Sequence, residues 1–236
     1  MEITQFPSTE ESFGYPLKKH FHIDPEIINL NSGEYGMTPK CIIDAKIRYY
    51  ATMEKNTDLF IRYHQTDMIE ETRKVVAEYL QADPEGIVFL GDSAEAIHTY
   101  LKSICETKGK GILYHDFLSP ETKNICHYIS EYFGIDTLEI PTSKDLINSS
   151  EKILLNLEEY LNEEKIKIVI IEHISRMGFL MPVKEIVQIC RKNNILCLVD
   201  GSQAFGQIDI HINELNPGKG AFTNVYLDRF LCNELS

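Results

Sequence analysis

Asp200 is the side chain in this sequence whose position most favours chemistry. It follows a continuous apolar run at residues 195–199 and precedes Gly201, Ser202 and Gln203. A carboxylate at the mouth of a buried strand loses water and needs a partner that balances its charge. Ribose hydroxyls would come with a GxGxxG motif and a serine nucleophile with GxSxG, and the sequence has neither at this place. The best fit is a protonated pyridine nitrogen, because the carboxylate would hold the charge that makes such a ring an electron sink.

The turn at residues 91–96, Gly-Asp-Ser-Ala-Glu-Ala, is a second place where a ligand could bind. It leads from the apolar run at residues 87–90 into a predicted helix, so it exposes backbone N–H groups at the positive end of that helix, which suits a phosphate. Asp92 and Glu95 also form a plain helix-capping pair. An acidic Asp92 beside a phosphate is unfavourable unless its side chain turns to the backbone.

Phe117 lies in a third such segment, just past the apolar run at residues 111–114. Its ring could cover the face of a flat ligand, or it could belong to the hydrophobic core, where aromatic rings more often lie. The residue alone leaves both readings open.

The elements that position these residues alternate between helical and extended patterns. Apolar residues recur at helical spacing, and short apolar runs without such spacing indicate strands buried on both faces. Together they predict an α/β fold with a mostly parallel sheet and helices on both faces, whose ligands lie beyond the carboxyl ends of the strands. Helices are expected at about 68–80, 94–106, 120–133, 153–161 and 183–191, and strands at about 87–90, 111–114, 136–140, 166–171 and 195–199.

Composition excludes several functional classes. A net charge of −13 over 236 residues opposes binding to nucleic acid or to an anionic membrane surface. The six cysteines form no CxxC pair, which favours reduced, buried thiols over a zinc site or a disulfide framework. The N-terminal residues lack a signal-peptide pattern, and no segment is apolar over the roughly 18 residues that span a bilayer. We therefore expect a cytoplasmic protein.

At this point the sequence resembles the class V aminotransferase family, in the branch of isopenicillin-epimerase-like proteins, cysteine desulfurases and hercynylcysteine sulfoxide lyases. Residues 28–39, INLNSGEYGMTP, resemble that branch's "LNHGSYG.TP" opening, and residues 59–63, LFIRY, resemble its "FIRY" element. The resemblance spans about residues 17–217 in consistent order. It implies the large domain of the aspartate-aminotransferase-like fold and the cofactor pyridoxal 5'-phosphate.

The resemblance also implies a set of cofactor-binding residues. The turn at residues 91–96 matches the family's "NATEA" turn, which places Ser93 and Ala94 at the phosphate, although a threonine usually stands where Ala94 is. Phe117 takes the place of a histidine that stacks on the pyridine ring. Asp200 matches the aspartate that pairs with the pyridine nitrogen. The remaining cofactor contacts implied are Ser175, in a segment similar to "DHITS", Gln203 near the phenolic oxygen, and Thr223 on the approach to the cofactor lysine.

The sequence departs from the family where the Schiff-base lysine should stand. After Thr223 and Asn224 the family continues into Asn-x-His-Lys-Trp, but here Leu227 occupies the lysine position, or Arg229 if two residues are inserted. Leucine has no amine and a guanidinium stays protonated, so neither replaces the lysine. No catalytic residue is therefore predicted.

These features predict an incomplete member of the family. Residues 1–38 are expected to be an N-terminal segment that packs on the large domain, residues 39–236 an incomplete pyridoxal-phosphate-binding large domain, and the small C-terminal domain is expected to be absent. The resemblance implies the lineage of a pyridoxal-phosphate-dependent carbon–sulfur lyase, or a related class V aminotransferase-family enzyme, acting on a cysteine-derived amino acid, and this chain is expected to be inactive as it stands. The alternative is a non-catalytic cofactor-binding protein or a dimer partner, as a homodimer or paired with a full-length chain; a gene product without stable function is a third reading.

Overall fold

The computed structural model describes residues 14–32, 35–104, 111–142, 149–161 and 166–215, together with the backbone of residues 221–223. The chain divides into two compact units, with the boundary between Val75 and Val76 inside helix α3, Gln65–Leu80. The proposed boundary after residue 38 stays a prediction. The second unit contains the sheet and all of the candidate site residues.

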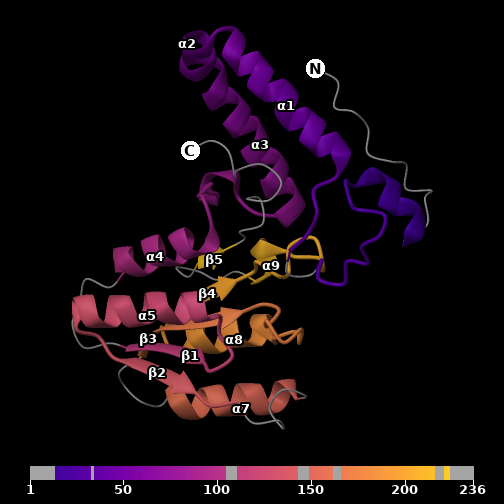
Figure 1. The fold of residues 1–236 in the computed structure, drawn as a ribbon. Coiled ribbons are helices and arrows are strands. Elements are labelled where there is room, and N and C mark those ends of the chain that lie inside the picture. The colour runs from indigo at the N-terminus through magenta and orange to yellow at the C-terminus, as the bar shows by residue number, and fades with distance from the viewer. Residues whose placement is uncertain are drawn as a thin grey trace. The chain divides into compact units, whose positions relative to one another are not determined.

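The sheet unit is built on five parallel strands in the order β2-β1-β3-β4-β5 (Figure 1). Adjacent strands pair in register, so that Glu172 on β3 lies beside Asp200 on β4, and Asp200 lies beside Thr223 on β5. The strands are β1 Gly111–His115, β2 Thr137–Ile140, β3 Ile166–Glu172, β4 Leu196–Asp200 and β5 Ala221–Thr223. The predicted parallel α/β sheet is confirmed.

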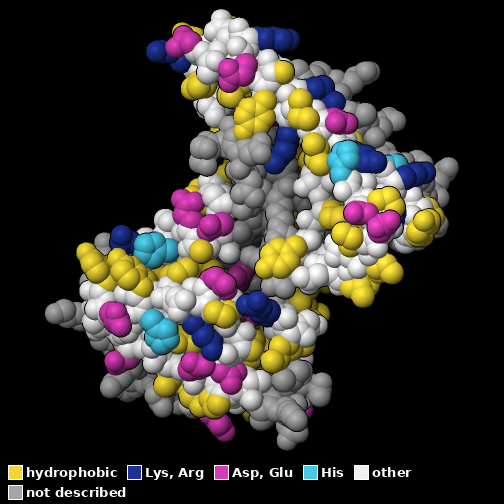
Figure 2. Space-filling model, in the orientation of Figure 1, with side chains coloured by type: hydrophobic (Ala, Val, Ile, Leu, Met, Phe, Trp, Pro, Cys, Tyr) yellow, Lys and Arg dark blue, Asp and Glu magenta, His cyan; other side chains and the backbone are white. Residues whose placement is uncertain are grey.

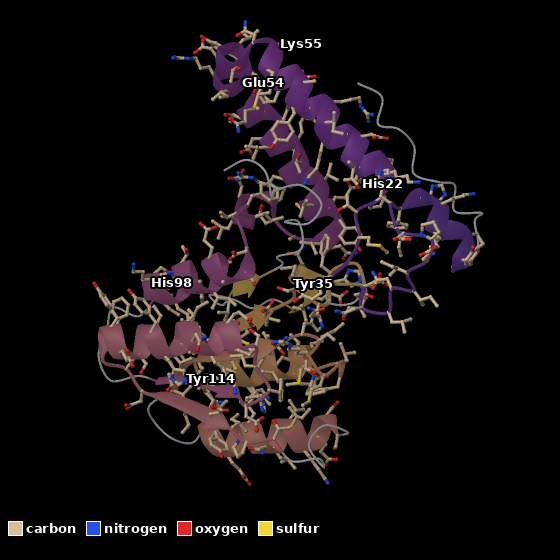
Figure 3. The ribbon with its side chains drawn as sticks, in the orientation of Figure 1. His22, Tyr35, Glu54, Lys55, His98 and Tyr114 are labelled. Atoms are coloured by element: carbon tan, nitrogen blue, oxygen red, sulfur yellow. The ribbon has the colours of Figure 1, made fainter. Side chains whose placement is uncertain are left out.

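Helices cover both faces of this sheet, as predicted. On one face, α7 (Ser150–Leu161) and α8 (Val183–Lys192) bury residues such as Leu157 and Ile186 against the strands. On the other face, α4 (Ser93–Ile104) and α5 (Pro120–Phe133) do the same with Ile97 and Ile129. Tyr114, labelled in Figure 3, lies in the sheet and is 1% exposed. Strands covered on both sides explain the continuous apolar runs in the sequence.

Helix α5 shows how the local sequence sets the ends of an element. Ser119 caps its first turn, because the Ser119 hydroxyl accepts a hydrogen bond from the Thr122 N–H at 3.2 Å, and Pro120 follows at a position that needs no N–H donor. Gly134 ends the helix with φ 66°, a left-handed conformation that glycine adopts without a Cβ penalty. The predicted helix at 120–133 is confirmed at both ends.

The predicted strand at residues 87–90 is wrong. These residues follow the short 3-10 helix η3, Pro84–Gly86, and form no strand pairing in the part of the chain that the structure describes. Val88 is 72% exposed and Leu90 36%, so the apolar run is not buried on both faces. An apolar run becomes a strand only where a neighbouring strand accepts its backbone hydrogen bonds, and sequence alone does not show that neighbour.

The outer surface of the α4–α5 layer carries an aromatic group. His98 contacts Tyr128 with ring centroids 5.5 Å apart, and Tyr128 stacks on Tyr132 at 5.9 Å. Hydrophobic and histidine side chains gather over these helices in Figure 2, and Figure 3 labels His98 on α4. Tyr128 and Tyr132 are 47% and 66% exposed, so this group faces solvent.

The described part of the first unit consists mainly of helical elements with many exposed apolar side chains. Ile28 is 84% exposed and Leu30 92%. Its elements are η1 Tyr15–His20, α1 Lys40–Lys55, α2 Thr57–Leu59, the π-helix η2 Phe60–His64 and the start of α3, and the first four of these bury no residue. Among the described residues of the whole chain, no helix is both long and apolar enough to span a bilayer.

Candidate functional site

The carboxyl ends of the parallel strands bring the candidate site residues to one edge of the sheet. His115 ends β1, Glu172 ends β3 and Asp200 ends β4. The backbone continues this pairing past the strands, because the His173 N–H donates to the carbonyl oxygen of Asp200 at 2.8 Å. Ligands of open parallel sheets bind at this edge.

Asp200 is 8% exposed, as expected for a carboxylate at the mouth of a buried strand. Its Oδ1 accepts hydrogen bonds from the Ser202 N–H at 2.9 Å and from the Ser202 hydroxyl at 2.5 Å. These bonds fix the orientation of the carboxylate and help to offset the cost of burying its charge. Asp200 is thus held as a rigid acceptor at the edge of the sheet.

Glu172, which the sequence reading did not select, is a second buried carboxylate beside Asp200. It is 6% exposed; its Oε1 accepts the Ser119 N–H and its Oε2 accepts the Arg176 N–H, both at 3.1 Å. Burial raises the pKa of Glu172 from 4.5 to about 7; the hydrogen bond from Arg176 opposes this rise, and the charge of Asp200 adds to it. Its place at the end of a continuous apolar run was the available sequence signal.

Phe117 lies between two other rings. His115 stacks on it with centroids 4.8 Å apart and an interplanar angle of 13°, and Phe179 meets it edge-on at 4.9 Å. Phe117 also packs against the core cluster on the α7–α8 side of the sheet, yet it stays partly exposed. It is therefore a half-buried ring at the edge, which serves the core and can still present an apolar surface to a ligand.

His115 is a buried imidazole without a hydrogen-bond partner among the described residues. It is 3% exposed, and neither ring nitrogen forms a hydrogen bond there. Burial lowers the pKa of His115 from 6.5 to about 4, against the opposing charge of Asp116. At neutral pH the ring is uncharged, and it stacks on Phe117.

Ser175 and Gln203 lie in the turns that follow β3 and β4. Ser175 is 2% exposed; its hydroxyl accepts the Phe179 N–H at 3.3 Å, and its own N–H donates to the Phe179 carbonyl at 2.9 Å. This pair of hydrogen bonds closes a turn that contains Gly178 at φ 84°. It also connects Ser175 to Phe179, whose ring meets Phe117. Gln203 lies three residues after Asp200 and is half-buried. The backbone of Thr223 pairs with Asp200. The Thr223 side chain lies outside the described structure.

The turn before α4 is capped by its own carboxylates. Asp92 Oδ1 accepts the Glu95 N–H at 2.7 Å, and Glu95 Oε2 accepts the Gly91 N–H at 2.7 Å. The capping reading of this turn is confirmed. Asp92 turns to the backbone, as a nearby phosphate would require, but Ala94 offers no hydroxyl to such a group.

These residues fit one end of a pyridoxal phosphate better than the other. Asp200 supplies a buried, oriented carboxylate for a pyridine nitrogen and Phe117 a flat apolar surface, whereas the turn at Ser93 and Ala94 holds two carboxylates that weaken its attraction for phosphate. In the described residues, no group of three or more His, Cys, Asp or Glu side chains could hold a metal ion.

Comparison with known proteins shows which family the sequence matches. A family model described as Aminotransferase class-V matches residues 29–217. The chain is 24% identical to the hercynylcysteine sulfoxide lyase of Schizosaccharomyces pombe, over 91% of this chain and 54% of that protein. It is 29% identical to an L-cysteine desulfhydrase-like protein of Epichloe uncinata, over 87% of this chain and 45% of that protein. The chain therefore spans about half the length of these relatives.

The fold is shared with solved structures of similar proteins. A complex of the cystine C–S lyase C-DES with cysteine persulfide superposes with a TM-score of 0.74 at 25% identity, covering 81% of this chain and 51% of that one. The apo cysteine desulfurase of Thermococcus onnurineus superposes with a TM-score of 0.71 at 21% identity, covering 88% and 52%. The predicted aspartate-aminotransferase-like large-domain fold is confirmed.

Proposed function

Because the chain belongs to the class V aminotransferase family, whose cofactor is pyridoxal phosphate, we propose that the edge of its sheet holds this cofactor. The observation that carries the proposal is Asp200, a buried carboxylate fixed by Ser202 at the end of β4. When bound, the cofactor supplies an electron sink for bonds at the α-carbon of an amino acid. The named relatives, a sulfoxide lyase and a desulfhydrase-like protein, support a lineage of carbon–sulfur lyases acting on a cysteine-derived amino acid.

Each described residue has a proposed role toward the ring. Asp200 accepts a hydrogen bond from the protonated pyridine nitrogen and keeps that proton in place. Phe117 covers one face of the ring, and its own position is fixed by His115 and Phe179. Ser175 and Gln203 orient the phenolic oxygen, and the N–H groups of Ser93 and Ala94 contact the phosphate.

We propose further that this chain binds the cofactor without a covalent bond and is inactive alone. Leu227 or Arg229 stands where the family has its lysine, and residues 220–236 contain no lysine. These positions lie outside the described residues, so the alignment of Thr223 and Asn224 carries this step. The alternative function is a non-catalytic partner for a second copy or for a full-length chain, which the exposed apolar side chains of the first unit favour. Sedimentation equilibrium of the purified chain, alone and with a full-length homologue, tests this alternative.

Calorimetric titration with pyridoxal phosphate tests the cofactor proposal. Asp200→Ala is expected to weaken binding about 10- to 100-fold, the range for loss of a hydrogen bond to a charged group. Asp209→Ala is the matched control, because Asp209 is exposed and lies on the same segment beyond β4. Equal affinities for the wild type and Asp200→Ala, or equal losses in both variants, would refute the assignment of Asp200.

A further inference from the structure

We propose that Glu172 is a positioning residue that fastens the loop after β1 to the turn after β3, and that binding of a cationic ring at Asp200 releases a proton from it. The second half of this inference rests on the proposed function. The first half concerns the chain alone and stands without a cofactor.

The two hydrogen bonds of Glu172 join segments far apart in the sequence. Oε1 binds the N–H of Ser119, the residue that caps α5 and follows Phe117 by two positions. Oε2 binds the N–H of Arg176, the residue after Ser175. The Glu172 carboxylate therefore sets the spacing between the Phe117 ring and the Ser175 hydroxyl, the two groups that are proposed to contact the cofactor. A neutral amide at this position can accept only through its single oxygen, so it leaves one of the two N–H donors without this acceptor.

The charges around Glu172 come from the elements packed against the end of β3. Asp200 on β4 raises the pKa of Glu172 and Arg176 in the following turn lowers it. On the β1–α5 side, Asp116 accepts the Thr142 N–H at 2.8 Å, and Lys123 forms an ion pair with Glu139 at 2.9 Å.

Among the residues that the structure describes, the other titratable groups on neighbouring elements are hydrogen-bonded elsewhere or are neutral at pH 7. At the start of α4, Asp92 and Glu95 accept N–H groups of their own turn. The lowered pKa values of His115 and His173 keep both rings neutral at pH 7. Asp200 is thus the anionic group whose state governs Glu172 most directly.

A cation paired with Asp200 would remove the repulsion that Glu172 feels. With a pKa of about 7, Glu172 is roughly half protonated at neutral pH. Neutralising Asp200 lowers that pKa, so the proton on Glu172 passes to the buffer when the ring binds. By linkage, affinity for the ring then rises with pH across the range around 7, by at most about tenfold for each unit of the pKa change.

The first experiment uses the protein without cofactor. The chain contains no tryptophan, so Phe179→Trp introduces a single tryptophan into the turn that Glu172 holds, and its emission can be excited apart from that of the tyrosines. Its emission is expected to show a transition near pH 7 that is absent from Phe179→Trp combined with Glu172→Gln. Other titrating groups change the tryptophan emission equally in both proteins, so they do not affect the comparison. A transition in both, or in neither, would overturn the positioning role. Should the Gln variant not fold, Glu172→Asp keeps a titrating carboxylate that is too short for both N–H donors, and its transition is expected at a different pH.

The second experiment measures pyridoxal phosphate affinity by calorimetry at pH 6 and pH 8, in buffers of different ionisation enthalpy. The phosphate itself titrates near pH 6, so the readout is the difference between wild type and Glu172→Gln. We expect the wild type to release more protons on binding and to gain more affinity at pH 8; Glu121→Gln, an exposed change on α5, should behave as the wild type does. Equal proton release in wild type and Glu172→Gln refutes the linkage. If Asp200→Ala loses all binding while the wild type releases protons as expected, the inference about Glu172 stands. If the wild type does not bind pyridoxal phosphate, the proposed function is refuted, and the fluorescence result still decides the positioning role of Glu172.

Discussion

Replacing His115 by phenylalanine should make the sheet unit more resistant to acid. The buried His115 ring has no hydrogen-bond partner in the described structure, and it stacks on Phe117. A phenyl ring keeps the stacking and removes two polar atoms that burial makes costly. It also removes the group whose protonation the folded state resists.

The size of the effect follows from the pKa of His115, which falls from 6.5 to about 4 in the folded protein. A group with a lowered pKa contributes stability that is complete above pH 6.5 and is lost as the pH falls through 4. Between pH 7.5 and pH 5 the wild type should lose about 2 kcal/mol through this group. Glu172 acts in the opposite direction, since its contribution is complete below pH 4.5 and is lost as the pH rises through about 7. Between about pH 4.5 and 6.5 the two groups change the free energy of unfolding in opposite directions. In His115→Phe only the pH dependence due to Glu172 remains of these two.

Urea unfolding followed by circular dichroism at pH 7.5 and pH 5 measures this difference. The advantage of His115→Phe over the wild type in free energy of unfolding should grow by about 2 kcal/mol at the lower pH. The matched control is His127→Phe, which changes an exposed ring on α5. An advantage that is the same at both pH values, or that the control reproduces, would show that His115 is not the buried neutral group inferred here.

Three further outcomes are expected. Ser119→Ala removes the acceptor of the Thr122 N–H and should cost about 1 kcal/mol in urea unfolding, whereas Ser103→Ala on α4 should cost less. Gly134→Ala places a Cβ at φ 66° and should cost about 1 kcal/mol by the same measurement, with Gly86→Ala, which has open space for a Cβ, as its control. Borohydride reduction in the presence of pyridoxal phosphate, followed by peptide mapping, should find no single labelled lysine; one specifically modified site would contradict the non-covalent proposal.

The sequence predicted the fold and the buried position of Asp200 at the end of its strand, because both depend on local patterns. Continuous apolar runs indicate strands covered on both faces, and a carboxylate that ends such a run must lie at the edge of the sheet. The strand prediction at residues 87–90 was wrong because it also rested on a local pattern. A strand requires a neighbouring strand, and the local pattern does not show whether one is present.

Glu172 and His115 were not predicted as site residues from the sequence, because their properties come from contacts with residues elsewhere in the fold. The hydrogen bond between Glu172 and Ser119 joins residues 53 positions apart, and no spacing rule predicts it. His115 has the sequence pattern of an ordinary polar residue after a strand, and its burial behind Phe117 is what lowers its pKa from 6.5 to about 4. For Phe117 itself the sequence left a choice between core and ligand face, and the structure shows a ring that packs on the core while staying partly exposed.

The order of the strands has a consequence for how the chain folds during synthesis. β1 pairs with β2 on one side, and each later strand joins the opposite edge of the sheet in the order in which it is made. Among the strands that the structure describes, every pairing after the first therefore adds beside a strand already made, and none of these strands is inserted later between two existing neighbours. Parallel pairings require long crossovers and close slowly. A chain emerging at roughly 5–20 residues per second can settle one crossover before the next strand appears, so refolding from denaturant, where all strands compete at once, should be slower and more prone to aggregation than folding on the ribosome.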